Sequence, residues 1–171
     1  DKELIKGLIA EYQQFVKSVS FVKRAVTLSD NFNYVFVGLR RVGKSYLMYQ
    51  QIHHLIETGI SPEEILFFNF EDERIAGMDT EHLDMIKRCY EEMYSHRPIF
   101  FLDEIQIVPH WEQFVRRLAD QKYRVYVTGS NAKMLSKDIA TTLGGRFMIQ
   151  YVYPFSFREY LSSNGVQLDK L

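Results

Sequence analysis

The sequence predicts an α/β fold in which helices cover both faces of a parallel five-stranded sheet. Three observations lead to this fold class: short apolar runs recur along the 171 residues, segments with helical periodicity separate them, and polar or glycine-containing turns follow them. Strands that are apolar throughout are typical of parallel sheets buried on both faces. We expect one domain, because the chain shows no internal repeat and no low-complexity linker.

The expected elements follow one another along the chain. Residues 3–19 carry apolar side chains at helical spacing and predict an amphipathic helix, which either packs on the domain or docks a partner. Strands are expected at residues 33–38, 65–70, 99–102, 124–128 and 146–152, with longer helices at 44–57, 80–94 and 111–120. Gly59 and Pro62 end the helix at 44–57. We assign residues 1–28 to an N-terminal helical segment packed on the core and residues 29–161 to the core itself.

Composition and charge exclude several classes of protein. The formal net charge of -1 shows no overall basic excess of the kind that favours nucleic acid, although four basic residues lie close together at Arg116, Arg117, Lys122 and Arg124. Cys89 is the only cysteine, so we expect no intramolecular disulfide and a reducing, cytoplasmic location. No apolar run approaches the roughly 18 residues that span a bilayer, so no membrane contact is expected. The N-terminus shows neither a signal peptide nor a methionine, which indicates a trimmed chain.

A complete phosphate-binding signature follows the first expected strand. Residues 38–45 read G-L-R-R-V-G-K-S and match G-x-x-x-x-G-K-[S/T] at every fixed position. The glycines let successive N–H groups point inward and form an anion-binding nest, and the helix that begins near Lys44 adds its positive dipole end. The sequence therefore predicts a P-loop in which Lys44 reaches the β- and γ-phosphates of a nucleotide and Ser45 offers its hydroxyl to Mg²⁺.

We expect the loop and the first helical turn to contact the nucleotide throughout. The contacting residues are then Gly38, Leu39, Arg40, Arg41, Val42, Gly43, Lys44, Ser45 and Tyr46. The two arginines have a second interpretation, as solvated loop residues that shield the phosphate site.

Two adjacent carboxylates end the third expected strand. In an open α/β sheet the ligand crevice lies at the carboxyl ends of the strands, so Asp103 and Glu104 are expected at the same edge as the P-loop. Asp103 is suited to hold Mg²⁺ through water, because hard cations prefer oxygen. Glu104 is suited to polarise an attacking water as general base. A Mg²⁺ site needs only one acid, so the pair favours hydrolysis.

Two later features are candidates for assisting residues. The fourth expected strand ends in small polar residues, of which Ser130 is the first choice for touching the γ-phosphate or orienting the water, followed by Thr128 and Asn131; a helix cap is the alternative role. Arg146 follows two glycines that allow a tight turn. It is either an arginine finger acting in trans on the ATP of a neighbouring copy, which would make a homo-oligomer, or a surface arginine before an edge strand.

Together these motifs resemble the prokaryotic AAA+ ATPases of the ORC/STAND-like branch, which usually carry a further C-terminal domain of unknown function. The matching stretches are GLRRVGKS, ILFFNFEDER, IFFLDEIQIVPHWEQFVRRLAD, VYVTGSNAKMLS, LGGRF and YPFSFREYL, in family order over residues 33–161. Relatives usually read P-L-S-F where this chain has Phe155.

The resemblance implies a three-layer α/β/α P-loop NTPase fold with the ASCE-type strand order 5-1-4-3-2, and it implies ATP and Mg²⁺ as ligands. It also implies a sensor within residues 128–131 and identifies Arg146 with the arginine of the GR motif. The family's helical lid and accessory domain would begin near Leu171, so residues 162–171 are expected to start a truncated C-terminal region. A second sensor arginine would then be missing from this fragment.

The expected function is that of an ATPase whose hydrolysis drives or switches contact with a partner. Two alternatives remain open at this stage. One is a nucleotide-dependent, DNA-associated regulator with little turnover, and the other is a P-loop kinase of small molecules, which would need an acceptor-binding segment that the sequence does not display. A DNA or protein client is compatible with each of these interpretations except the kinase.

Overall fold

A computed structural model of the protein describes residues 1–130, 134 and 138–165. Five parallel strands form one sheet: β1 (Asn33–Val37), β2 (Ile65–Asn69), β3 (Ile99–Asp103), β4 (Val125–Gly129) and β5 (Phe147–Tyr151). Their order across the sheet is β2-β3-β4-β1-β5, which read from the β5 edge is the expected 5-1-4-3-2. The fold class is therefore confirmed.

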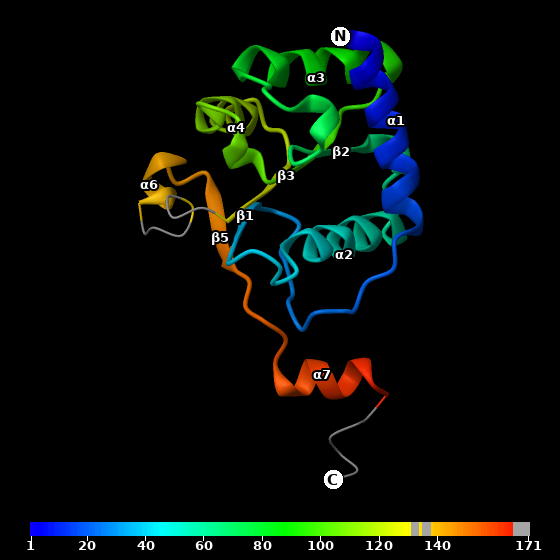
Figure 1. Ribbon diagram of the computed structural model, residues 1–171, viewed down its shortest axis with the longest axis vertical. Coiled ribbons are helices and arrows are strands. Elements are labelled where there is room, and N and C mark those ends of the chain that lie inside the picture. The colour runs from blue at the N-terminus through cyan, green and yellow to red at the C-terminus, as the bar shows by residue number, and fades with distance from the viewer. Residues whose placement is uncertain (131–133, 135–137, 166–171) are drawn as a thin grey trace.

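Helices cover the sheet on both sides (Figure 1), with α1 (Lys2–Ser18) and α2 (Lys44–Glu57) on one side and α4 (Trp111–Asp120) and the short α6 (Ile139–Thr142) on the other. The helix α3 (Thr80–Met93) contacts both α1 and α4. A last helix, α7 (Phe157–Ser163), lies away from these layers beyond the end of β5. The core consists mainly of the aliphatic and aromatic side chains of the central strands, which are buried on both faces.

The strands end slightly differently from the sequence-based expectation. β3 continues to Asp103, which pairs with Asn69 in the ladder, and β4 continues to Gly129, which pairs with Val37. The backbone carbonyl of Asp103 also accepts a hydrogen bond from the Phe70 amide at 3.0 Å. These pairings extend the ladder through the polar residues, so the sheet itself fixes the backbone that carries the acidic and hydroxyl side chains.

The N-terminal helix α1 packs its apolar face against β2 and α3, and its residues Ile5, Leu8, Ile9 and Val16 are each at most 1% exposed. Its polar contacts add specificity: the Tyr12 hydroxyl donates to Asp72 at 2.6 Å, and Gln13 donates to the carbonyl of Ile65 at the start of β2 at 3.1 Å.

Replacing Ile9 with alanine is expected to lower the free energy of unfolding by about 2–5 kcal/mol, because it opens a cavity in this packed face. Leu4→Ala on the same helix is the control, since Leu4 is 40% exposed. Urea denaturation measures both variants. Equal losses for the two would show that α1 is not packed as described.

Candidate active site

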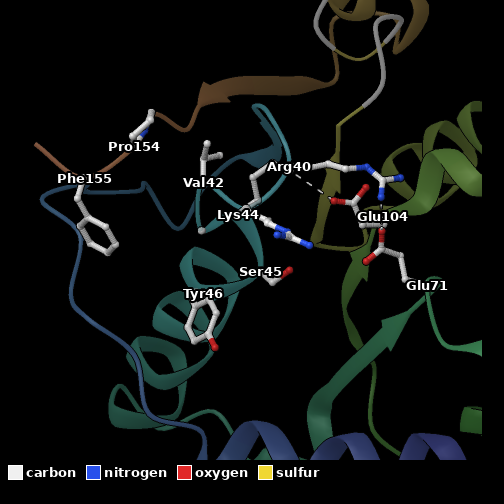
Figure 2. Close-up of a pocket in the computed structure, with 11 residues that line it drawn as sticks. Arg40, Val42, Lys44, Ser45, Tyr46, Glu71, Glu104, Pro154 and Phe155 are labelled. Atoms are coloured by element: carbon white, nitrogen blue, oxygen red, sulfur yellow. Dashed lines mark ion pairs between the residues drawn. The ribbon is translucent and has the colours of Figure 1, made fainter.

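A cavity of about 650 Å³ opens at the carboxyl edge of the sheet, between the loop after β1 and the loop after β3. Its lining is Arg40, Arg41, Val42, Gly43, Lys44, Ser45, Tyr46, Glu71, Glu104, Pro154 and Phe155. Figure 2 shows Lys44 pointing toward Glu104 at one end of the cavity, with the rings of Tyr46 and Phe155 toward the other. The cavity therefore has a charged end and an aromatic end.

The glycine-rich loop reaches α2 through a left-handed residue. Gly43 has φ +95°, a conformation that strains residues with a side chain, and α2 begins at the next residue without a side-chain cap from Gly43. The first-turn amides of α2 therefore face the cavity without that cap. Lys44 is only 4% exposed, and its Nζ donates to the Leu39 carbonyl at 2.7 Å.

The Lys44 ammonium has little solvent to stabilise it. Burial lowers its pKa from the ordinary value, and the nearby carboxylates of Glu104 and Asp103 partly offset that effect. The closest of these charges is Glu104 Oε1, 3.8 Å from Nζ. A buried ammonium whose closest carboxylate lies beyond hydrogen-bond length is suited to receive an anion.

Asp103 lies at the centre of a hydroxyl-lined oxygen cluster. Its Oδ2 accepts from the Ser45 hydroxyl at 2.7 Å, and its Oδ1 accepts from the Thr128 hydroxyl at 2.6 Å. Asp103 is 4% exposed, and this burial raises its pKa to about 6, while the two hydroxyl donors act in the opposite direction.

Glu104 turns away from the strand in a left-handed conformation, with φ +54°, which costs a non-glycine residue energy and re-aims its side chain. Its backbone amide donates to the Thr128 hydroxyl at 2.8 Å, so Thr128 fixes both acidic residues. Its Oε2 accepts from the Ser130 hydroxyl at 2.9 Å and from the amide of Gln106 at 2.5 Å.

A second cavity of about 370 Å³ adjoins the aromatic end of the first and shares Gly43, Tyr46 and Phe155 with it. The remaining lining residues, Ser20, Phe21, Val22 and Arg24, come from the segment between α1 and β1. Aromatic and aliphatic side chains dominate the lining of this second cavity, so it is suited to a flat apolar group.

Arg24 joins this segment to the glycine-rich loop and to α7. Its guanidinium donates to the carbonyls of Val42, at 3.2 Å, and of Tyr153, and it forms an ion pair with Glu159 at 3.1 Å. The guanidinium also lies over the Phe155 ring, 4.4 Å from its centroid. One buried side chain thus connects three segments around the two cavities.

Comparison with known proteins shows the family of this chain. A family model described as an AAA domain matches residues 30–161. The chain belongs to this family. It is 32% identical over 171 residues to an uncharacterized protein of Methanocaldococcus jannaschii, covering 99% of this chain and 37% of that protein. It is 36% identical over 151 residues to an uncharacterized protein of Haemophilus influenzae, covering 86% of this chain and 38% of that protein.

Among solved structures, the AAA domain is similar to the Aeropyrum pernix ORC1 protein in complex with DNA, with a TM-score of 0.49 and 14% identity. The match covers 96% of this chain and 49% of that one. The chain therefore spans less than half of that protein and under two fifths of the curated relatives above. Membership of the AAA family confirms the resemblance to AAA+ P-loop ATPases seen in the sequence.

The structure brings most of the predicted site residues of the AAA domain together. Lys44, Ser45, Asp103 and Glu104 all lie at the carboxyl edge of the sheet. Ser130 donates to Glu104 there, and its sensing role stays a prediction. Asn131, the other polar candidate, lies outside the described residues.

Arg146 lies elsewhere. It directly precedes β5, and β5 runs parallel to β1, so Arg146 is at the opposite edge of the sheet from the P-loop. Its Nε donates to Asp120 at 2.5 Å, and 36% of the side chain is exposed. It does not reach the cavity of its own chain, and its role as a finger in trans stays a prediction.

Several residues around the cavity were not predicted from the sequence as site residues, among them Gln106, Arg24, Glu71, Pro154 and Phe155. Glu71 forms an ion pair with Arg40 at 3.9 Å across the cavity mouth, so one of the two loop arginines is paired with a carboxylate of its own chain. A signal for Gln106 was present in the D-E-I-Q stretch. None was present for Arg24, because its contacts arise from segments more than a hundred residues apart.

The part of the chain that the structure describes lacks two further features. No helix there combines the length and apolarity that crossing a bilayer requires. No group of three or more His, Cys, Asp or Glu side chains there is placed to hold a metal ion alone.

Replacing Arg24 with methionine is expected to lower the free energy of unfolding by about 3–5 kcal/mol, because it leaves the mostly buried Glu159 carboxylate without its cation. The double variant Arg24→Met/Glu159→Gln is expected to recover part of this loss, since it removes the unpaired charge. Denaturation curves measure both. A double variant no more stable than the single one would contradict the described pairing.

The raised pKa of Asp103 predicts a pH dependence for Mg²⁺ binding. The carboxylate must be ionised to bind Mg²⁺, so the affinity of the nucleotide complex for Mg²⁺ is expected to fall about tenfold per pH unit below about pH 6. The metal-free fold has the opposite dependence: because its pKa exceeds the ordinary 3.8, Asp103 stabilises folding as the pH falls from 6 toward 4.

Titration of Mg²⁺ with a fluorescent ATP analogue between pH 7 and pH 5 tests the first dependence, and a parallel titration of the nucleotide alone corrects for its own protonation. Asp103→Asn is expected to bind Mg²⁺ weakly with no residual pH dependence from this group. A corrected affinity that is constant from pH 7 to pH 5 would contradict the assignment.

Proposed function

We propose that this AAA domain binds Mg·ATP in the cavity behind the P-loop and hydrolyses it. The observation that supports this most is that the glycine-rich loop, Lys44 and Glu104 line one cavity at the carboxyl edge of the sheet. Asp103 lies next to that cavity and accepts a hydrogen bond from Ser45, which lines it. Each group has a separate task in this arrangement.

The triphosphate binds at the start of α2. The first-turn amides of that helix and the Lys44 ammonium receive the phosphate oxygens, and the phosphate gives the buried ammonium a direct negative partner besides Glu104. The nucleoside extends toward the rings of Tyr46 and Phe155. The base binds in the adjoining second cavity, because flat groups pack well on aromatic faces.

The residues present fit a Mg²⁺ ion. Ser45 and Asp103 are 2.7 Å apart through their oxygens, and hard oxygen atoms are what Mg²⁺ prefers. A bound Mg²⁺ would take its remaining ligands from phosphate oxygens and water. When bound, Mg²⁺ neutralises charge on the β- and γ-phosphates.

Glu104 accepts a proton from the attacking water. The water oxygen forms a bond to the γ-phosphorus, the bond from that phosphorus to the β–γ bridging oxygen breaks, and ADP and inorganic phosphate leave. The proton goes to a Glu104 carboxylate oxygen, and Lys44 is the nearest positive charge to it. Turnover of this kind would drive or switch contact with a partner such as DNA or another protein. Arg146 would act as an arginine finger on the ATP bound to a second copy of this chain.

The test is to measure Mg·ATP binding by calorimetry and inorganic phosphate release without any added acceptor. Magnesium-dependent release of phosphate is expected. Binding without release would favour a nucleotide-dependent regulator, and release only on addition of a small-molecule acceptor would favour a kinase. No binding of Mg·ATP would refute the proposal.

A further inference from the structure

The two oxygens of the Glu104 carboxylate have different surroundings. Oε2 accepts two hydrogen bonds, one from Gln106 Nε2 at 2.5 Å and one from Ser130 Oγ at 2.9 Å. Oε1 faces the ammonium of Lys44 at 3.8 Å, which is an electrostatic contact beyond hydrogen-bond length. One oxygen is therefore occupied by donors, and the other remains available on the cavity side.

Gln106, one of these two donors, lies two residues after Glu104 in the chain. It lies in a short 3-10 helix over Ile105–Ile107, which begins directly after the left-handed turn at Glu104. That turn folds the chain back, so the amide of Gln106 reaches the carboxylate of its near neighbour.

The other end of the Gln106 amide is closely confined. Its Oε1 is buried and has no hydrogen-bond partner among the described residues, an arrangement that is unfavourable for a polar atom. That oxygen lies against the last residue of β4: a Cβ added to Gly129 would be 2.9 Å from it. Gly129 therefore leaves space for two side chains, Met134 and Gln106.

We propose that Gln106 is a positioning residue for hydrolysis, which holds Glu104 Oε2 so that Oε1 is the oxygen that receives the proton from water. This inference rests on the proposed ATP hydrolysis. Gln106 does not itself line the nucleotide cavity, and it acts through its hydrogen bond to Glu104, which does. Ser130 alone leaves the carboxylate free to rotate about a single hydrogen bond, whereas two donors on one oxygen fix its plane.

The test compares variants of Gln106 that keep its size. Gln106→Met removes the donor, and Gln106→Glu replaces it with an acceptor that repels Glu104. Both are expected to lower kcat for ATP by about 10- to 100-fold, the loss that a misplacement near 1 Å causes, while the dissociation constant for Mg·ATP stays within about twofold. Ile107→Ala in the same short helix is the control, because Ile107 is 48% exposed, and it is expected to retain kcat.

The two Gln106 variants are independent tests. If one of them folds poorly, the other still tests whether Gln106 positions Glu104.

Three outcomes would overturn the inference. A kcat within twofold of wild type in a folded Gln106 variant would show that the contact has no part in turnover. A parallel loss of kcat and of Mg·ATP affinity would indicate a general disturbance of the site. Wild-type protein that binds Mg·ATP without hydrolysing it would remove the inference together with the hydrolytic half of the proposed function, a result that the variants alone cannot produce.

Discussion

Replacing Glu104 with glutamine is expected to lower the rate of ATP hydrolysis by about 10²–10⁴-fold and to leave Mg·ATP binding intact. Glutamine keeps the shape of the side chain and an oxygen that can accept from Ser130, but it has no carboxylate to take a proton from water. The phosphate-binding groups on the opposite side of the cavity are unchanged. The variant is therefore expected to hold ATP for longer than wild type, which single-turnover measurements of bound nucleotide would show.

Glu71→Gln is the matched control for this variant. Glu71 lines the same cavity and is also a glutamate, yet its contact is the ion pair with Arg40 at 3.9 Å and 46% of its side chain is exposed. We expect hydrolysis by this variant to remain within a few-fold of wild type. Equal losses for the two glutamates, or full activity of the Glu104 variant, would mean that another group takes the proton.

The strands of the sheet were predictable because their signals are local. Each strand is a run of apolar residues, and the P-loop motif marks the strand that leads into the first helix of the core. The order of the strands came from the family resemblance, since apolar periodicity alone does not say which strands are neighbours. The ends of β3 and β4 were less predictable, because their last residues belong to the ladder through pairings with other strands.

The helix α7 shows a local signal that was available and not used. Ser156 and Glu159 form a capping box: the Ser156 hydroxyl accepts from the Glu159 amide at 3.2 Å, and Glu159 Oε1 accepts from the Ser156 amide at 3.0 Å. The sequence S-x-x-E is typical of a helix start, although the short run after it has no clear apolar periodicity.

The residues of the candidate site also fall into two groups: those that a local motif predicts and those that only the tertiary structure brings together. Lys44, Ser45, Asp103 and Glu104 were identifiable because their chemistry depends on spacing within a motif. The roles of Gln106 and Arg24 depend on tertiary geometry: one requires a left-handed residue at Glu104, and the other requires Val42, Tyr153 and Glu159 to meet. No periodicity in the sequence encodes either arrangement.

Replacing Lys44 with alanine is expected to abolish measurable Mg·ATP binding at concentrations that saturate wild type, a loss of at least about 100-fold in affinity. A buried charge-assisted hydrogen bond to phosphate is worth about 1.5–3 kcal/mol, and the loss of charge at a site with little solvent adds to it. The variant also leaves Glu104 without its nearest cation, 3.8 Å away, which increases repulsion of the triphosphate. Calorimetric titration with Mg·ATP measures the loss.

Arg40→Ala separates this effect from a general reduction of positive charge. Arg40 belongs to the same loop and lines the same cavity, but 76% of its side chain is exposed, so water screens its charge. Its loss is expected to weaken Mg·ATP binding by no more than about fivefold, and added salt is expected to reduce that difference. A buried ammonium that contacts phosphate directly is little screened, so the defect of Lys44→Ala should persist in high salt. If salt removed both defects alike, Lys44 would act only as a surface charge, and the P-loop would not be the phosphate site.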